Sequence, residues 1–567
     1  MTVSDYIIDF FVRKGIKDFF GYQGTMIAYF VDAIHRNPNA NNHSCYNEQG
    51  ASFAACGYAQ AGKKCGVAYS TSGPGAVNLL SGVANAYFDS EPTIFITGQL
   101  NTYEYTGIPE MRQQGFQEIN IVEMAKPITK YAVQITDAKD TRYELEKAWY
   151  LANNGRKGSV LIDLPMNIQR TEFNADEQQK FTPSINETQK IEYQQIYDAL
   201  SKSKRPVIIV GNGVCDRYQS KLKAFIKINN IPTITTLLAS SFLSEDELHL
   251  GNMGSSYGNR TALMAVHKAD LLISIGASLG KRQTGVKLEN FAPNAQLIRI
   301  DIDETQLKAK IKKGELQIKA DTSNFIEGLT INKYTQDIEE WVDFIHSVKA
   351  YYTNFDKNLP ELYPNHYIES ISDLLPDGYN VVSDVGQHMM WVAQSFHLKK
   401  DQLMLFSGGH GAMGYALPAA IGAYYANRKP SIAISGDGAF QMNIQELQWV
   451  VREKLPIKIV VMNNHCLGMI RSVQEDYIDS RYEGVSEESN FSPCRFKEIA
   501  QAYGIESKRI TFIDELDNIT FDSQSAFLLE IDMDNKTLAL PKTFFGDPVY
   551  RQRPYIPDAD LQKMLDF

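Results

Sequence analysis

Long apolar runs, metal-spaced cysteines and clusters of basic residues are all missing from this sequence. No stretch reaches the roughly 18 uninterrupted apolar residues that a membrane-spanning helix needs. The net charge is −11 without basic clusters, which argues against nucleic acid as a partner. The cysteines do not follow the spacing of metal ligands. We expect them to be reduced thiols that pack as small apolar residues: Cys45, Cys56, Cys65, Cys215, Cys466 and Cys494.

The amino terminus also lacks the features of a signal peptide. It has no basic start, and Asp5 and Asp9 interrupt its apolar pattern. We therefore expect a cytoplasmic protein. Its 567 residues are too many for one hydrophobic core, and 44% hydrophobic with 22% charged residues is an ordinary globular composition, so three domains are expected.

The most informative stretch joins Asp437 to Asn464, 27 residues later. Short apolar runs at 431–435 and 456–462 predict two buried strands, with a helix at 445–452 between them. Asp437 and Asn464 then lie at the carboxyl ends of the strands, where an open parallel sheet binds its ligand. A carboxylate and an amide oxygen beside glycines suit Mg²⁺ next to phosphate. Taken alone, a Gly-Asp-Gly tripeptide is usually only a turn.

Together with its strands and helix, this segment resembles the thiamine diphosphate-binding motif of acetohydroxyacid synthase-like enzymes, and the resemblance extends over nearly the whole chain. It implies that the metal is held by Asp437, Asn464 and the backbone carbonyl of Cys466. It also implies an α/β fold of three doubly wound parallel-sheet domains followed by a tail: a pyrimidine-binding domain at 1–170, a central flavin-binding-like domain at 190–345, a diphosphate-binding domain at 360–545 and the tail at 546–567.

Glu48 is a lone carboxylate before a run of small and apolar residues, 51–59, that predicts a buried helix. A glutamate at a helix start is most often a solvated cap. The resemblance implies a different role, in which this carboxyl group faces the aminopyrimidine ring of the cofactor and favours the tautomer that removes the thiazolium proton. Asn47 stands where many family members have histidine. Phe116 and Gln117 match residues that border the substrate in the family.

Further thiamine diphosphate contacts follow from the same resemblance. For the glycine-rich turn at 71–75, the plain alternative is a well-formed turn between a strand and a helix. The implied contacts are Gly24, Thr71, Gly73, Gln387, His388, Gly411, Met413, Gly436, Gly438, Ala439, Asn464, Leu467, Gly468 and Met469.

The central domain carries a weaker signal for a second cofactor. Gly211 and Gly213 alone are poor evidence for a dinucleotide site, because no third glycine follows. Segments between 250 and 303 are similar to the flavin-binding domain of the synthases, where the counterpart of Arg282 lies between flavin and substrate. An empty, vestigial cleft is the alternative. The resemblance implies FAD, held for structure rather than redox chemistry, by Gly211, Gly213, Gly276, Arg282 and Asp301.

Two departures from the family pattern shape the prediction of function. The chain has no adjacent His-His pair, which decarboxylases that release free aldehyde carry, so it resembles a carboligase. Val473 stands where the synthases have a tryptophan that shapes the pocket for the second 2-ketoacid. We therefore expect decarboxylation of pyruvate and transfer of the two-carbon acyl-anion unit to a carbonyl acceptor. The pattern resembles the yersiniose-type carboligases of deoxysugar pathways, whose acceptor is a nucleotide-linked ketosugar.

Two alternatives remain. One is acetolactate synthase, in which the acceptor is a second pyruvate; the other is a regulatory relative that binds the cofactor without turnover. The family builds its cofactor site between domains of different subunits, which implies a homodimer or a dimer of dimers.

At the chain ends, we expect Ser4 to cap the first helix. The tail from Pro548 has too many prolines and charges for a helix, and we expect it to fold over a cleft.

Overall fold

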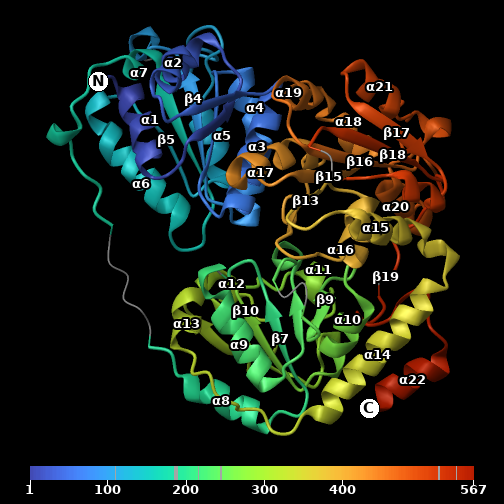
Figure 1. The fold of residues 1–567 in the computed structure, drawn as a ribbon. Helices are drawn as coiled ribbons and strands as arrows, with labels where there is room; N and C mark the ends of the chain where they lie inside the picture. The colour runs from blue at the N-terminus through green and yellow to red at the C-terminus, as the bar shows by residue number, and fades with distance from the viewer. Residues whose placement is uncertain are drawn as a thin grey trace.

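Three six-stranded sheets, each of parallel strands only, organise the computed structural model (Figure 1). The expected fold class of three α/β domains is confirmed. The structure describes residues 1–106, 108, 110–183, 190–214, 216–242, 246–521, 524–544 and 546–567. Part of the predicted linker, 184–189, lies outside the described residues, as do the thiol of Cys215 and Gly107 and Pro109 in the long loop before Phe116.

The first domain has the strand order β2-β1-β3-β4-β6-β5. Its strands are β1 (Asp18–Gly21), β2 (Asn41–Ser44), β3 (Gly66–Ser70), β4 (Thr93–Gln99), β5 (Tyr131–Gln134) and β6 (Ser159–Pro165). Its helices are α1 (Val3–Arg13), α2 (Ala28–Arg36), α3 (Glu48–Gly62), α4 (Pro74–Asp89), α5 (Ile121–Ala125), α6 (Thr141–Asn153) and α7 (Met166–Gln169).

The cap of α1 differs from the prediction. Thr2, not Ser4, caps the helix: its hydroxyl accepts the N–H of Asp5 at 3.2 Å, and the Asp5 carboxylate accepts the N–H of Thr2 at 2.8 Å. Ser4 lies inside the helix and is buried. The reciprocal pair satisfies two N–H groups at once, so the helix begins where both partners are present.

The central domain has the order β12-β11-β10-β7-β8-β9. Its strands are β7 (Pro206–Val210), β8 (Thr233–Thr235), β9 (His249–Asn252), β10 (Leu271–Ile275), β11 (Gln296–Asp301) and β12 (Leu316–Lys319). Its helices are α8 (Tyr193–Lys202), α9 (Gln219–Asn229), α10 (Arg260–Lys268), α11 (Lys281–Thr284), α12 (Glu304–Lys308), α13 (Thr322–Gly328) and α14 (Glu339–Lys357). Because α14 runs past residue 345, the domain boundary there stays a prediction.

The third domain repeats the pattern in the order β14-β13-β15-β16-β18-β17. Its strands are β13 (Asn380–Ser383), β14 (Leu403–Phe406), β15 (Ser431–Gly436), β16 (Ile457–Asn463), β17 (Glu506–Ile510) and β18 (Phe527–Asp532). Its helices are α15 (Tyr363–Leu374), α16 (Gln387–Ser395), α17 (Ala416–Asn427), α18 (Asp437–Gln441), α19 (Leu447–Arg452), α20 (Gly468–Tyr477) and α21 (Phe496–Ala502). A 3-10 helix, η10 (Ile444–Glu446), begins the predicted helix at 445–452.

Helices α3 and α17 join the first and third domains into one hydrophobic core. Their backbones come so close that a Cβ on Gly57 would lie 2.1 Å from the carbonyl oxygen of Ala419, and a Cβ on Gly422 would lie 1.8 Å from that of Ala54. Only glycine fits at such contacts. Helix α3 begins at Glu48, so the packing against α17 fixes the position of the predicted catalytic segment.

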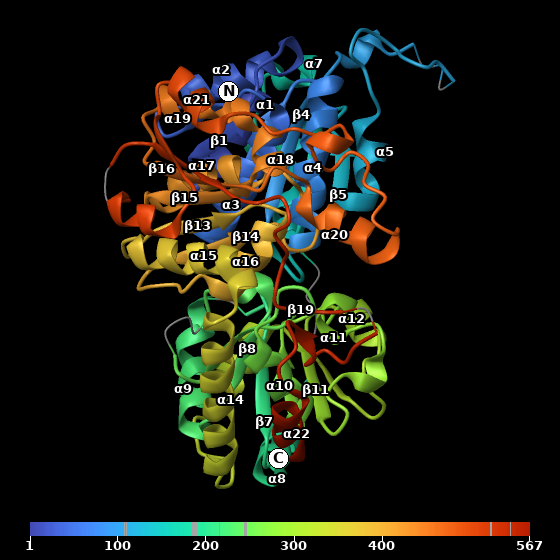
Figure 2. The same cartoon turned by 90° about the vertical axis from the view of Figure 1, so that its right-hand side faces the viewer.

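The tail comes after the third domain in the chain and packs against the central domain. Its last part is helical, contrary to the prediction. A short hairpin of β19 (Lys542–Thr543) and β20 (Gln552–Arg553) precedes α22 (Asp558–Asp566). Acidic residues in the first turn of α22 favour the helix through its dipole, once the prolines have passed. Figure 2 shows α22 beside α10, where Lys268 donates to the carbonyl of Leu565 at 2.6 Å.

Candidate functional site

Asp437 is a buried carboxylate with one oxygen unsatisfied. It opens α18 directly after β15 and is 3% exposed. Oδ1 accepts the N–H of Gly438 at 2.7 Å, whereas Oδ2 has no hydrogen-bond partner among the described residues. Burial raises the pKa of Asp437 to about 6, against the opposing effect of backbone N–H groups that include those of His465 and Cys466. A buried oxygen left without a donor is what a cation site requires, so this residue fits Mg²⁺.

Asn464 is oriented by two buried acceptors. Its amide nitrogen donates to Oε1 of Gln387 and to Oγ1 of Thr537, each at 2.8 Å. Both amide hydrogens are therefore engaged, and the amide oxygen is left as the ligand atom. Thr537 was not predicted. It follows β18 in a segment without a recognisable motif, so only the folded chain reveals its role.

In Cys466, the backbone carbonyl is the candidate metal ligand, and the thiol is not. The residue is 2% exposed, and burial raises the pKa of the thiol to about 12. The carbonyl oxygen accepts the N–H of Gly468 at 2.9 Å and keeps a second lone pair. Among the described residues, no group of three or more His, Cys, Asp or Glu side chains is placed to hold a metal. The candidate ion site therefore comprises one carboxylate with amide and carbonyl oxygens, and its role in holding a metal stays a prediction.

Gln387 and His388 form the first turn of α16, a position suited to a phosphate group. His388 is 3% exposed, and its Nε2 has no partner among the described residues. Burial lowers the pKa of His388 to about 3, so the ring is neutral near pH 7. A Cβ on Gly436 would lie 2.8 Å from Nδ1 of this ring, and one on Gly468 would lie 2.1 Å from Oε1 of Gln387. Both glycines are thus needed for close packing.

Met413 and Leu467 both lie close to Gly438. A Cβ on Gly438 would lie 2.4 Å from Cδ2 of Leu467 and 3.6 Å from Cε of Met413. Gly411 adopts a φ of +71°, in the left-handed region that favours glycine. Ala439 is buried in α18, and Met469 packs against the third-domain core. The predicted residues around the diphosphate motif therefore form one cluster.

Glu48 belongs to a second cluster, in the first domain. It is 8% exposed, and its Oε2 accepts the side-chain N–H of Asn78 at 3.0 Å. Asn78 was not predicted, although it lies in the first turns of the helix that follows the glycine-rich segment 71–75. The hydroxyl of Thr71 is buried without a partner among the described residues, and a Cβ on Gly24 would lie 2.5 Å from the Thr71 side chain. Unpartnered polar atoms beside Glu48 fit the polar ring of a ligand.

Gln117 reaches this cluster, whereas Phe116 points away from the protein. Gly73 and Gln117 have φ values of +59° and +61°, and a Cβ on Gly73 would lie 2.8 Å from the carbonyl oxygen of Gln117. Phe116 is 78% exposed. The structure thus brings Gly24, Glu48, Thr71, Gly73 and Gln117 together, and leaves Phe116 at the rim.

In the central domain, Gly211, Gly213 and Gly276 meet at the point where the strand order reverses. A Cβ on Gly211 would lie 2.0 Å from the carbonyl oxygen of Gly276, and one on Gly213 would lie 2.9 Å from its Cα. Asp301 ends the adjacent strand β11 and accepts the N–H of Asp303 at 2.8 Å. The carboxyl ends of β7 and β10, where the order reverses, are the usual ligand position in such sheets. Arg282 lies elsewhere, on α11.

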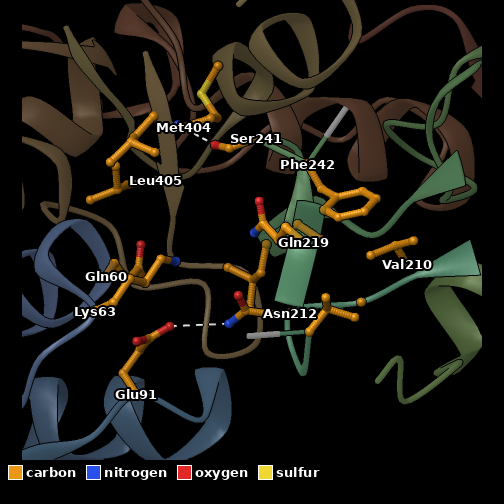
Figure 3. A pocket seen from close by; sticks show the side chains of 15 residues that line it. Gln60, Lys63, Glu91, Val210, Asn212, Gln219, Ser241, Phe242, Met404 and Leu405 are labelled. Atoms are coloured by element: carbon orange, nitrogen blue, oxygen red, sulfur yellow. Dashed lines mark hydrogen bonds between the residues drawn. The ribbon is translucent and has the colours of Figure 1, made fainter. Parts of the chain in front are cut away.

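A cavity of about 170 Å³ lies where the three domains meet (Figure 3). Gln60 and Lys63 line it from the first domain, Phe242 from the central domain and Met404 from the third. Asn212, beside Gly211, donates to Glu91 of the first domain at 3.3 Å. Of the residues predicted to bind a cofactor, Gly211 alone lines this cavity, so it is not the thiamine diphosphate site.

A second cavity, of about 250 Å³, separates the tail from α11 and α20. Lys281, next to Arg282, lines it together with Tyr477 of α20 and Val549 of the tail. The tail is held there because the hydroxyl of Thr543, in β19, donates to the carbonyl of Val549 at 2.8 Å. The tail therefore does border a cleft, as expected.

Comparisons with known proteins agree with this architecture. Three family models match in order: the N-terminal TPP binding domain of thiamine pyrophosphate enzymes at residues 1–124, the central domain at 193–329 and the C-terminal TPP binding domain at 384–526. Within the described residues, no helix combines the length and apolar character that crossing a membrane requires.

Several acetolactate synthases are similar over most of their length. The chloroplastic acetolactate synthase 1 of Oryza sativa subsp. japonica is 34% identical, over 95% of this chain and 85% of that protein. The acetolactate synthase large subunit of Porphyra purpurea is 35% identical, over 88% and 86%. The isozyme 2 large subunit of Escherichia coli (strain K12) is 32% identical, over 94% and 96%. This chain therefore belongs to the thiamine pyrophosphate enzyme family and has acetolactate synthases among its homologues.

Proposed function

We propose that this chain joins two molecules of pyruvate, with uptake of one proton, to give 2-acetolactate and CO₂. The full-length similarity to proteins named acetolactate synthase supports this reaction. The observation that carries it to this chain is the pair of clusters around Glu48 and Asp437, each with a buried carboxylate beside unpartnered polar atoms. The same pair argues against a regulatory relative without turnover, because such a protein has no use for both carboxylates.

The chain's residues divide the work between the two clusters. Bound thiamine diphosphate would supply an electron sink for loss of CO₂ from a 2-ketoacid. Asp437, Asn464 and the carbonyl of Cys466 would hold Mg²⁺, and the start of α16 would bind the diphosphate. Glu48 would hold a proton against the pyrimidine ring, where Asn78 keeps its carboxylate in place.

A second candidate acceptor is a bulky ketone such as a nucleotide-linked ketosugar. The comparisons favour pyruvate over it. What supports the ketosugar is Val473, a small side chain that is 45% exposed on α20, the helix whose Tyr477 lines the 250 Å³ cavity with Lys281. Lys281 and Lys287 line that cavity together with Asp547, and two cationic side chains suit an anionic acceptor.

A competition assay decides between these acceptors. Pyruvate is offered alone and together with a cyclic ketone or a nucleotide-linked ketosugar, and products are separated chromatographically. We expect acetolactate in both mixtures. If Val473 leaves room for bulky ketones, wild type also forms the mixed product, and Val473→Trp reduces that product by roughly 10- to 200-fold because an indole fills the space. Pyruvate decarboxylation stays unchanged, since Val473 lies outside both clusters. Absence of acetolactate with pyruvate alone would overturn the main proposal.

We also propose that FAD binds at the carboxyl ends of β7 and β10, near Gly211 and Gly276. We further propose a dimer or a dimer of dimers as the active unit. Val77 beside Asn78, and Met442 near Asp437, leave apolar side chains 38% and 49% exposed, which supports a second copy packing there. Native mass spectrometry checks both assignments. We expect two or four chains, with one thiamine diphosphate, one Mg²⁺ and one FAD per chain. An active, flavin-free monomer would contradict them. A cytoplasmic location stays a prediction.

A further inference from the structure

The segment between Asp437 and Asn464 does more than space the two metal ligands. Glu446, at the end of η10, is fully buried, and both of its carboxylate oxygens accept the N–H of Tyr46 at 3.1 Å. The N–H of Asn47 also faces this carboxylate. Tyr46 lies 400 residues earlier in the chain, in the first domain. A third-domain carboxylate thus holds the backbone directly before Glu48.

Gly50 and Gln49, in the first turn of α3, also contact the third domain. A Cβ on Gly50 would lie 2.6 Å from Oε1 of Glu446, so the carboxylate fits directly against the helix backbone. Asn443, which is 1% exposed, donates from its amide nitrogen to Oε1 of Gln49 at 3.1 Å and to the carbonyl of Gly414 at 2.9 Å. The first turn of a helix has unsatisfied N–H groups and a partial positive charge, so a carboxylate there stabilises it.

Within the first domain, the described contacts of Glu48 and its neighbour Asn47 do not reach the third domain. Its side chain accepts from Asn78, and Asn47 caps α3 by accepting the N–H of Gln49 at 2.8 Å. Neither contact fixes the backbone of residues 46 and 47 against the third domain. That orientation comes from Glu446 and, through Gln49, from Asn443. Arg452 of α19 adds to it, because its guanidinium donates to the hydroxyl of Tyr46 at 3.2 Å and to the carbonyl of Ser44.

We propose that Glu446, assisted by Asn443, is a positioning residue that sets the placement of the Glu48 carboxyl group. It touches neither substrate nor cofactor and acts through the backbone at Tyr46 and Asn47. The inference rests on the proposed function in so far as Glu48 is the activating carboxylate. Because catalytic geometry tolerates little displacement, a loosened first turn lowers turnover rather than substrate binding.

The test combines amide exchange with kinetics. In Glu446→Ala without cofactor, we expect the amides of residues 44–52 to exchange hydrogen about tenfold faster or more, the effect of losing about 1.4 kcal/mol of protection. With cofactor, we expect kcat to fall by roughly 10²-fold while KM for pyruvate stays near wild type. Exchange of the thiazolium proton should slow in parallel. Glu446→Gln keeps one acceptor oxygen at the same length, and we expect it to restore most of the protection and of kcat.

Glu315→Gln is the matched control. Glu315 is a buried carboxylate that accepts the N–H groups of Ile311 and Lys312 at 3.0 and 2.9 Å, far away in the central domain. It should lower the melting temperature without changing exchange at 44–52 or at the thiazolium carbon. The proposal is overturned if Glu446→Ala keeps full protection at 44–52, or loses protection and keeps the kcat of wild type, or if Glu446→Gln loses as much protection and kcat as Glu446→Ala. If wild type forms no acetolactate but the exchange results hold, the proposed reaction fails and the positioning role stands.

Discussion

Glu48→Gln is expected to slow exchange of the thiazolium proton by roughly 10²- to 10⁴-fold, the range that one positioned acid or base contributes. Glutamine has nearly the same size and keeps an oxygen for Asn78, but its amide has no acidic proton to transfer to the pyrimidine ring. The cofactor should bind almost as well as in wild type, because its diphosphate and metal are held in the third domain. Deuterium exchange followed by NMR measures the rate, and calorimetry measures cofactor affinity.

Glu144→Gln is the control for this result. Glu144 belongs to α6 of the same domain and accepts from Tyr131, remote from α3. It should leave thiazolium exchange unchanged. A near wild-type exchange rate in Glu48→Gln would show that Glu48 is not the residue that activates the cofactor.

Asp437→Ala is expected to weaken thiamine diphosphate binding by roughly a hundredfold or more at low Mg²⁺, since removing one partner of a buried charge pair costs about 3–5 kcal/mol. Asn464 and the carbonyl of Cys466 supply no charge to replace it. Affinity should recover partly as Mg²⁺ is raised. Calorimetry at two Mg²⁺ concentrations measures both effects.

Asp437→Asn and the cofactor-free proteins give the controls. Asparagine keeps an oxygen in place and should bind the cofactor with intermediate affinity. Without cofactor, Asp437→Asn should not unfold earlier than wild type, because it keeps an oxygen for the N–H of Gly438 and because Oδ2 of Asp437 is buried without a partner among the described residues. Unchanged thiamine diphosphate binding at low Mg²⁺ would be incompatible with the metal assignment.

Local sequence patterns predicted most of the fold around the site. The apolar run at 431–435 is β15, and the run at 456–462 overlaps β16. The small-residue run at 51–59 lies within α3. Such segments are identifiable because burial on both faces of a parallel sheet, or in a closely packed helix, requires consecutive apolar or small residues. The errors arose at ends of elements: Thr2 displaced Ser4 as a cap because Asp5 completes its pair, and the tail becomes helical after its last proline.

The sequence by itself determined which residue types form the two clusters. Asp437, Asn464 and Glu48 belong to motifs whose residues lie near one another along the chain, so the motifs can be identified without the fold. Only the tertiary structure decided what holds them: Thr537 and Gln387 on Asn464, Asn78 on Glu48, and Glu446 on the backbone before Glu48. A motif reflects neighbours along the chain, whereas these hydrogen bonds join residues 30 to 400 positions apart. Their partners are chosen by the packing of whole domains, because α3 can meet Glu446 only once it has docked on α17.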